Sequence, residues 1–329
     1  MTEADLTSIP SISLGAFLRG SPTGQRTIAA RVDEICRTTG FLVVEEHGIP
    51  GDVITEAWAE IGAFFDLPLS EKLKSRSADP TCPRGYFPLA AEALARSRGV
   101  DTPPDLKESF GIGPLRPPAA PMPAADLEFH FGRNFWPADP PRLRDALTRY
   151  FTEMQALGSR VLRLFAAALD LPHDYFERFH TDPMCALRCI RYPSREGPLA
   201  SGQRGAGEHS DYGSITLLKP DPEVAGLEIR LPSGQWAAAP LVQDAFIVNI
   251  GDMMARWTND RWVSTMHRVA SPGGNMPSRQ SIAFFHNTSH DALIECIPTC
   301  SDEAKPARYA PVEAGRYLFE RFISAVNYA

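Results

Sequence analysis

The segment GEHSDYGSITLL, residues 207–218, places a histidine and an aspartate two positions apart, directly before an apolar run. If this segment is extended, His209 and Asp211 project from one face and Ser210 from the other, because successive side chains of a strand alternate. Such a pair is consistent with a salt bridge, with half of a catalytic dyad, or with two ligands of one metal ion. The rest of the chain must distinguish these possibilities.

The second half of the chain predicts a β-rich core. After residue 183 the sequence consists of short strand-like segments separated by turns. They are CALRCIRYP (185–193), SITLLKPD (214–221), GLEIRLPSGQWAAAP (226–240), AFIVNIGDMMARWT (245–258), WVSTMHRVASP (262–272) and QSIAFFHNTS (280–289). Within the third of these, PSGQ predicts a hairpin turn. Strands of this length and spacing favour a sandwich or a jelly roll.

The first half predicts mostly helices. Apolar residues recur at helical spacing in residues 27–39, 53–67 and 140–171, and the first pattern ends at a glycine. FLVVEEHGIP (41–50) predicts a strand followed by a turn. Residues 76–125 are rich in Pro, Gly and Arg and lack periodicity, which predicts a long lid or binding loop. A closing helix is expected over AGRYLFERFISAV (314–326), so the fold class is α+β.

Composition excludes several classes of protein. The 329 residues are 43% hydrophobic and 22% charged, as in ordinary globular proteins, and the net charge of −7 disfavours nucleic acid as a partner. There is no run of 18 apolar residues that would predict a membrane span. The acidic start, MTEADLTSIP, lacks the pattern of a signal peptide. We therefore expect a cytoplasmic protein.

The six cysteines are too sparse for a disulfide framework. Cys185 and Cys189 are four residues apart, as are Cys296 and Cys300, but zinc sites usually show tighter knuckles flanked by turns. We expect reduced thiols that are mostly packed as small hydrophobic groups.

A second histidine and an arginine add to the opening pair. His267 lies in STMHRVASP, and two histidines with one carboxylate form a ligand set that suits non-haem Fe(II). In RQSIAFF, Arg279 and Ser281 would share one face of a strand, where a guanidinium and a hydroxyl can bind a carboxylate.

Each of these motifs alone is weak, since a His-x-Asp pair is more often an ordinary surface pair. A rival pair, His286 and His290, lies in the turn-rich HNTSH, and we expect these two to be solvated or structural. The remaining histidines lie in helical or loop segments without a nearby acid–base constellation and are expected to be structural: His47, His130, His173 and His180.

Taken together, HSDYGSITLL, GDMMARWTNDRWVSTMHRV and RQSIAFF resemble the isopenicillin N synthase-like family of Fe(II)- and 2-oxoglutarate-dependent oxygenases. Ser210 stands where members typically have threonine between the two ligands. The likeness extends upstream, in the order of the family, through SIPSISL, GFLVVEEHGIP, FFDLPLSEKLK, RGYFPLAAE, DLKESFGIG and NFWP. The resemblance therefore covers nearly the whole chain.

This resemblance implies a double-stranded β-helix, or jelly roll, with buttressing helices from the N-terminal region and a C-terminal helix. It implies an N-terminal region over residues 1–125, a long buttressing helix and connector over 126–182, the jelly-roll core over 183–290, and a C-terminal tail and helix over 291–329.

The resemblance also implies residue roles. The iron ligands are then His209, Asp211 and His267, and the 2-oxoglutarate anchors are Arg279, Ser281 and Tyr192. Many plant-type members have asparagine where this chain has Ile190, which puts in doubt a co-substrate contact from that position.

The implied activity is oxidation of a small molecule by O2, with 2-oxoglutarate converted to succinate and CO2. The product is hydroxylated, desaturated or cyclised, and the pathway is expected to make a secondary metabolite. Expected substrate contacts are Arg84, Tyr86, Arg191 and Phe285, with walls from the proline-rich stretch between Cys82 and Pro118 and from the C-terminal helix around Tyr317 to Phe322. A monomer is expected.

Two alternatives stay open. Some members of this family use no keto-acid, and their Arg-x-Ser pair binds a carboxylate of the substrate. A non-catalytic jelly roll that binds a small acid is the other. Stoichiometric release of succinate separates the first alternative from the main interpretation.

Overall fold

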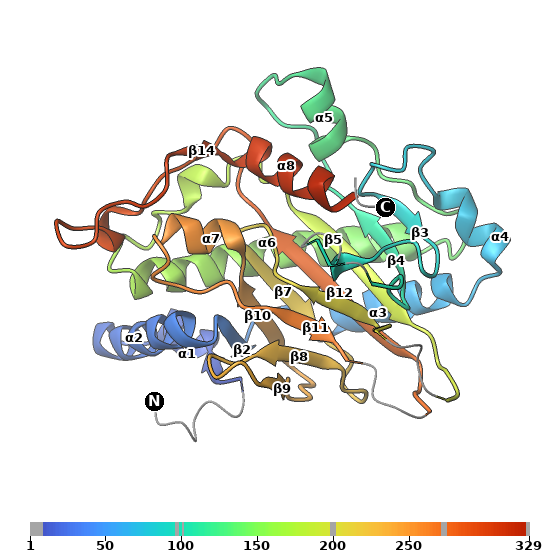
Figure 1. Ribbon diagram of the computed structural model, residues 1–329, viewed down its shortest axis with the longest axis horizontal. Coiled ribbons are helices and arrows are strands. Elements are labelled where there is room, and N and C mark those ends of the chain that lie inside the picture. The colour runs from blue at the N-terminus through green and yellow to red at the C-terminus, as the bar shows by residue number, and fades with distance from the viewer. Residues whose placement is uncertain (1–8, 96–98, 101, 198–201, 271–274, 327–329) are drawn as a thin grey trace.

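The largest β-sheet of the described residues forms the centre of the molecule (Figure 1). The computed structural model describes residues 9–95, 99–100, 102–197, 202–270 and 275–326. Within these residues the sheet has eight strands, which are antiparallel except for the first pair. In spatial order they are β1 (Ser11–Ser13), β2 (Phe41–Glu45), β10 (Phe246–Ile250), β7 (Ile215–Lys219), β12 (Arg279–His286), β5 (Ala186–Tyr192), β4 (Glu108–Ile112) and β3 (Gly85–Phe87).

A smaller sheet packs on one face of the larger one. Its strands are β6 (Ala206–His209), β11 (His267–Val269), β8 (Leu227–Arg230) and β9 (Trp236–Ala238). Leu227 and Ile229 of β8 share an apolar cluster with Phe41, Val43 and Ile247 of the larger sheet. The predicted jelly roll is therefore confirmed, and so is the predicted hairpin, because β8 pairs with β9 across the PSGQ turn.

Helices cover the other face of the larger sheet. α2 (Pro22–Thr38) and α3 (Gly51–Phe65) both pack against α6 (Leu143–Ala168), which also contacts β7 and β12 (Figure 1). Apolar side chains of the helices and of this outer face form the main core. None of the helices in the described residues combines the length and the hydrophobicity that a membrane crossing needs.

The shorter elements surround this frame. They are α1 (Leu14–Arg19), α4 (Leu69–Lys72), α5 (Ala124–Phe131), α7 (Asp252–Trp257), α8 (Ala314–Val326), the pair β13 (Leu293–Ile294) and β14 (Val312–Glu313), and 3-10 turns at Leu73–Ser75, Glu177–Phe179 and Pro298–Cys300. α8 coincides with the predicted closing helix. It lies beside α5 at the top of Figure 1, and Phe129 of α5 packs edge-on against Phe319 of α8.

The predicted loop over residues 76–125 contains two strands that the sequence analysis missed. β4 pairs with β5, and β3 pairs with β4 at the edge of the larger sheet. Phe110 and Ile112 of β4 join the main core, whereas the residues between them and beside them are small or polar. Short strands at a sheet edge carry little periodicity, and their neighbours in the sheet supply the hydrogen bonds that hold them extended.

The prediction that AFIVNIGDMMARWT is strand-like throughout was wrong. β10 ends at Ile250, Gly251 begins a turn, and α7 follows. Met253, Met254 and Trp257 are buried against the main core, a spacing that a single helical turn brings to one side.

The sequence regions 1–125 and 183–290 share the larger sheet, in which strands of the first region flank those of the second on both sides. β1 to β4 come from the first region and the other strands of the larger sheet from the second. The boundaries expected from the resemblance therefore divide the sequence, but strands from both regions belong to one sheet.

Candidate metal centre

Three predicted ligands converge at one end of the β6–β11 pair. The potential ligand atoms of His209, Asp211 and His267 all lie within 4.8 Å of one another. His209 ends β6, His267 begins β11, and the two face each other across the antiparallel pair with ring centroids 4.3 Å apart. The Nε2 of His267 lies 3.8 Å from Oδ1 of Asp211.

The local structure around Asp211 differs from the prediction. β6 ends at His209, so Asp211 lies in the turn that leads into β7, and strand alternation is not what aligns it with His209. The carbonyl of Asp211 accepts a hydrogen bond from the N–H of Asp252 at 2.7 Å, which ties this turn to the start of α7. The two side chains meet because of this turn.

Backbone carbonyls orient both imidazoles. Nδ1 of His209 lies 2.7 Å from the carbonyl oxygen of Gly207, and Nδ1 of His267 lies 3.1 Å from that of Thr265. A carbonyl can only accept, so each Nδ1 carries the hydrogen and each Nε2 keeps a free lone pair. This is the usual outer hydrogen bond of a metal-binding histidine.

The carboxylate of Asp211 is held in a similar way. Its Oδ2 accepts hydrogen bonds from Thr216 Oγ1 at 2.6 Å and from Asn249 Nδ2 at 2.7 Å, which leaves Oδ1 facing the histidines. Burial by itself raises the pKa of Asp211. The two histidines and the two hydrogen bonds outweigh burial and lower the pKa below its ordinary value.

The donor set fits an Fe(II) ion. Burial, followed by the neighbouring His267, lowers the pKa of His209 and favours its neutral, metal-binding form. Two neutral imidazoles and one carboxylate on one side leave open positions, as in non-haem iron oxygenases. In the part of the chain that the structure describes, no other three His, Cys, Asp or Glu side chains come together in this way. All six cysteines are free thiols.

The predicted carboxylate anchors lie on the inner face of the larger sheet. Arg279 is only 4% exposed, its Nε donates to the carbonyl of Val224, and its Nη1 is buried without a hydrogen-bond partner among the described residues. The guanidinium lies over the ring of Tyr192, 5.0 Å from its centroid, and both residues line a small cavity. Ser281 follows on the same face of β12. A buried cation with an unused donor is suited to bind an anion.

The predicted substrate contacts separate into two groups. Phe285 is half-buried on the inner face of β12, where it is paired with Thr216, the residue that holds Asp211. Arg191 projects from the outer face of β5, because it forms an ion pair with Asp66, directly after α3. The prediction that Arg191 contacts the substrate stays untested. Its ion pair directs the side chain away from the interior.

Arg84 and Tyr86 are both buried in structural contacts. Arg84 donates to the carbonyls of Glu128, Phe129 and Arg133, so it closes the C-terminal end of α5. The hydroxyl of Tyr86 donates to Glu108 at 2.6 Å, and its ring belongs to the main core. These contacts favour a structural role for both residues.

Other predicted features are also placed. Ile190 packs beside Tyr192 on the inner face. An apolar side chain therefore occupies the position at which many plant-type family members have asparagine. Of the rival pair, His286 is 1% exposed and stacks on His180, which contradicts a solvated position and agrees with a structural one. Within the expected wall between Cys82 and Pro118, residues 96–98 and 101 lie outside the described residues.

Sequence reasoning missed Thr216 and Asn249. Asn249 lies in FIVNI, a strand that is buried at every position, and a polar residue in such a strand requires a hydrogen-bond partner. That requirement was a signal available in the sequence. Thr216 in SITLL gave no comparable signal, since threonine is common in strands.

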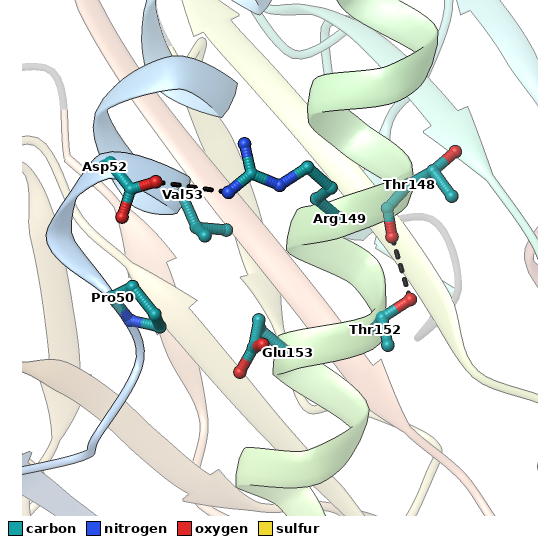
Figure 2. Close-up of a pocket in the computed structure, with 7 residues that line it drawn as sticks. All are labelled: Pro50, Asp52, Val53, Thr148, Arg149, Thr152 and Glu153. Carbon is teal, nitrogen blue, oxygen red and sulfur yellow. Dashed lines mark hydrogen bonds and ion pairs between the residues drawn. The ribbon is translucent and has the colours of Figure 1, made fainter.

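A larger hollow, of about 320 Å³, lies elsewhere on the surface between α3 and α6 (Figure 2). Arg149 of α6 reaches across it and pairs with Asp52 of α3 at 3.1 Å. None of its lining residues belongs to the predicted site, so its size carries no functional weight.

Comparison with known families gives two matches that together span most of the chain. A model described as the N-terminal region of a non-haem dioxygenase in morphine synthesis matches residues 9–139. A model described as the 2OG-Fe(II) oxygenase superfamily matches residues 181–288, which contain all three residues of the His-Asp-His cluster.

Individual proteins agree with these matches. A 2-oxoglutarate-Fe(II) type oxidoreductase of Emericella nidulans is 32% identical and covers 93% of this chain and 87% of its own length. A homoarginine-6-hydroxylase of Oryza sativa is also 32% identical, with coverage of 90% and 89%. The crystal structure of Neurospora crassa T7H with alpha-KG and thymine is 31% identical, covers 98% of both chains and superposes with a TM-score of 0.84.

Proposed function

This chain belongs to the 2OG-Fe(II) oxygenase superfamily, and from that premise we propose that His209, Asp211 and His267 bind its iron. The enzyme is a non-haem dioxygenase that uses Fe(II), 2-oxoglutarate and O2. The observation that carries the residue assignment is the outer hydrogen bonding. Each imidazole is oriented through Nδ1 and the carboxylate through Oδ2, so that three lone pairs point to one place.

When bound, Fe(II) supplies the centre at which O2 oxidises 2-oxoglutarate to succinate and CO2 and the substrate is then oxidised. The side chains contribute binding and geometry. Thr216 and Asn249 keep one oxygen of Asp211 occupied, so only the other oxygen is available to the metal. No side chain has to act as a general base.

Arg279, Ser281 and Tyr192 bind the far carboxylate of 2-oxoglutarate in this proposal. The unused Nη1 of Arg279 supports the assignment, because a buried guanidinium with a missing partner is costly unless an anion completes it. The relatives named for 2-oxoglutarate favour this assignment over the keto-acid-independent oxidase, in which the same guanidinium would bind a carboxylate of the substrate.

The substrate is a small molecule, and its hydroxylation, desaturation or cyclisation in secondary metabolism is part of the proposal. Relatives do not fix its identity, because one is named for homoarginine and a structural neighbour holds thymine. A cytoplasmic monomer without a nucleic-acid partner completes the proposal, consistent with the net charge of −7.

An anaerobic titration of Fe(II) and 2-oxoglutarate into the apo-protein tests the assignment. We expect a weak visible charge-transfer band that requires both components and that is absent from Asp211→Ala. Iron binding without the band supports the oxidase, and a turnover assay decides, since only the 2-oxoglutarate mechanism releases succinate in proportion to product. Failure of the wild-type protein to bind iron contradicts the ligand assignment.

A further inference from the structure

Arg188 lies on the inner face of β5. It is not among the site residues that the sequence predicted. Its neighbours Leu187 and Cys189 belong to the main core on the outer face, so Arg188 points inward with Tyr192. Its Nη2 donates to Glu92 at 2.8 Å, and its Nε donates to Ser109 at 3.2 Å.

Strand register places Arg188 near the metal centre. On β12 its direct partner is Ala283, two residues before Phe285 on the same face. Phe285 in turn pairs with Thr216, which holds Asp211. The row of inward side chains therefore runs from Thr216 across Phe285 to Ala186, and Arg188 is the next inward residue along β5.

A chain of charges connects Arg188 to the opposite side of the metal centre. Glu92 also pairs with Lys107 at 3.4 Å, and Lys107 lies 3.8 Å from Asp105. Asp105 accepts the N–H of Gly207 at 2.9 Å, and the carbonyl of Gly207 orients His209. These four charged side chains thus extend around the interior from β5 to β6.

Arg188 and Glu92 form the more exposed part of this chain, with side chains that are 17% and 24% exposed. Asp105 and Lys107 are 1% and 6% exposed and are occupied by each other and by backbone groups. One face of the Arg188 guanidinium is covered by the ring of Phe87, 4.1 Å away. Its Nη1 has no hydrogen-bond acceptor among the described residues.

Charge balance restricts what this guanidinium can bind. The two cations, Arg188 and Lys107, are matched by two carboxylates, Glu92 and Asp105. A carboxylate or an ammonium group on a substrate would be taken out of water here without a free counter-ion, which is unfavourable. Arginine has donors only, so its partner must be an acceptor.

We propose that Arg188 is a substrate-binding residue whose Nη1 donates to the carbonyl oxygen of an uncharged substrate, such as an amide or a lactam, with the substrate's apolar body against Phe285. This inference rests on the proposed function. It selects neutral carbonyl compounds over acids and amines of the same size.

Three probes of similar size test the charge preference: benzamide, benzoate and benzylamine. Their binding to the anaerobic Fe(II)–2-oxoglutarate enzyme is measured by ligand-observed NMR. We expect benzamide to bind about tenfold or more tightly than the other two, because a hydrogen bond from a charged donor is at stake. Benzoate or benzylamine binding more tightly than benzamide overturns the inference.

Two variants assign the preference to Arg188. Arg188→Met should weaken benzamide about tenfold or more, while Arg191→Met, the same change on the outer face of the same strand, should leave it unchanged. Equal effects of both changes overturn the inference.

Glu92→Gln removes one negative charge and keeps the shape of the side chain. If Arg188 faces the substrate, the freed guanidinium should raise benzoate affinity severalfold, which a merely structural pair would not do. Unchanged benzoate affinity contradicts the inference. The charge-transfer band, recorded in each sample, reports separately on the proposed function: its absence from the wild-type enzyme overturns both, whereas its presence with a preference for benzoate overturns the inference alone.

Discussion

The two faces of the larger sheet differ in what covers their side chains. On the outer face, Ile282 and Phe284 of β12 are fully buried against the helices. On the inner face of the same strand, Arg279 keeps a buried donor that has no partner among the described residues, and Phe285 is only half-buried. The outer face is covered by the protein's own helices, whereas we propose that the co-substrate and the substrate cover part of the inner face.

This contrast explains how one strand serves stability and chemistry together. Alternation fixes inner side chains as soon as the outer ones are packed, because a one-residue slip would exchange the two faces. Arg188 and Arg191, three residues apart on β5, illustrate the result. The first joins the charged chain inside the jelly roll, and the second pairs with Asp66 near α3.

The largest effect should come from removing a proposed metal ligand on the inner side. Asp211→Ala takes away the single carboxylate of the cluster, so we expect loss of Fe(II) binding and of all measurable turnover with the fold retained. Equilibrium dialysis with Fe(II) and circular dichroism measure the two properties. Asp66→Ala, an exposed acid on the outer side, is the control and should keep both. Normal turnover by Asp211→Ala would show that the cluster is not the iron site.

Adjacent phenylalanines offer a direct test of the two faces. Phe284 packs edge-on against Phe151 of α6, with ring centroids 5.0 Å apart, and Phe284→Ala should cost about 3–5 kcal/mol of unfolding free energy. Phe285→Ala makes the same chemical change on the inner face and should destabilise the fold less while reducing turnover. Urea unfolding and steady-state kinetics measure both variants. If the two lose equal stability, the distinction between the faces does not hold.

Arg279→Ala should leave Fe(II) binding intact and raise the 2-oxoglutarate requirement steeply. Truncating one partner of a buried charged pair typically costs about 2–5 kcal/mol, which corresponds to roughly 30-fold or more in KM for 2-oxoglutarate. The neighbouring Gln280 donates to the carbonyl of Trp58 on the outer side, so Gln280→Ala is the matched control. An unchanged KM in Arg279→Ala would remove this residue from the co-substrate site.

Asn249→Ala tests the support behind the ligands. Loss of its hydrogen bond to Asp211 should reduce Fe(II) affinity about 10- to 100-fold, as for other outer contacts of metal ligands. The measurement is competition for Fe(II) with a chelator of known affinity. Thr216→Val should act in the same direction, because it removes the other hydrogen bond to the same oxygen. Full affinity in both variants would mean that the turn alone orients Asp211.

The smallest effect is expected at Arg191. In its ion pair with Asp66, the aspartate side chain is largely exposed. Arg191→Met should therefore change stability by no more than about 1 kcal/mol and leave the kinetic constants unchanged. Steady-state kinetics with the substrate compares the variant with the wild-type enzyme. A raised substrate KM would restore the contact that the sequence predicted.

Sequence alone determined the jelly roll, the buttressing helices and the chemical identity of the cluster. Helical periodicity marked α2, α3, α6 and α8, because each buries one stripe over several turns. Residue type marked the proposed ligands, because few side chains bind iron. Strand alternation was sufficient for Arg279 and Ser281, since both lie within β12.

Tertiary structure decided what depends on contacts between distant segments. β3 and β4 exist because β5 offers them hydrogen bonds, and Asp211 reaches the histidines through a turn fastened to α7. Which arginine faces the interior also depends on strand register, so Arg191 was predicted at the site and Arg188 was overlooked. A sequence records side chains in order, but the face that each presents is set only when its strand pairs with its neighbours and one face is buried.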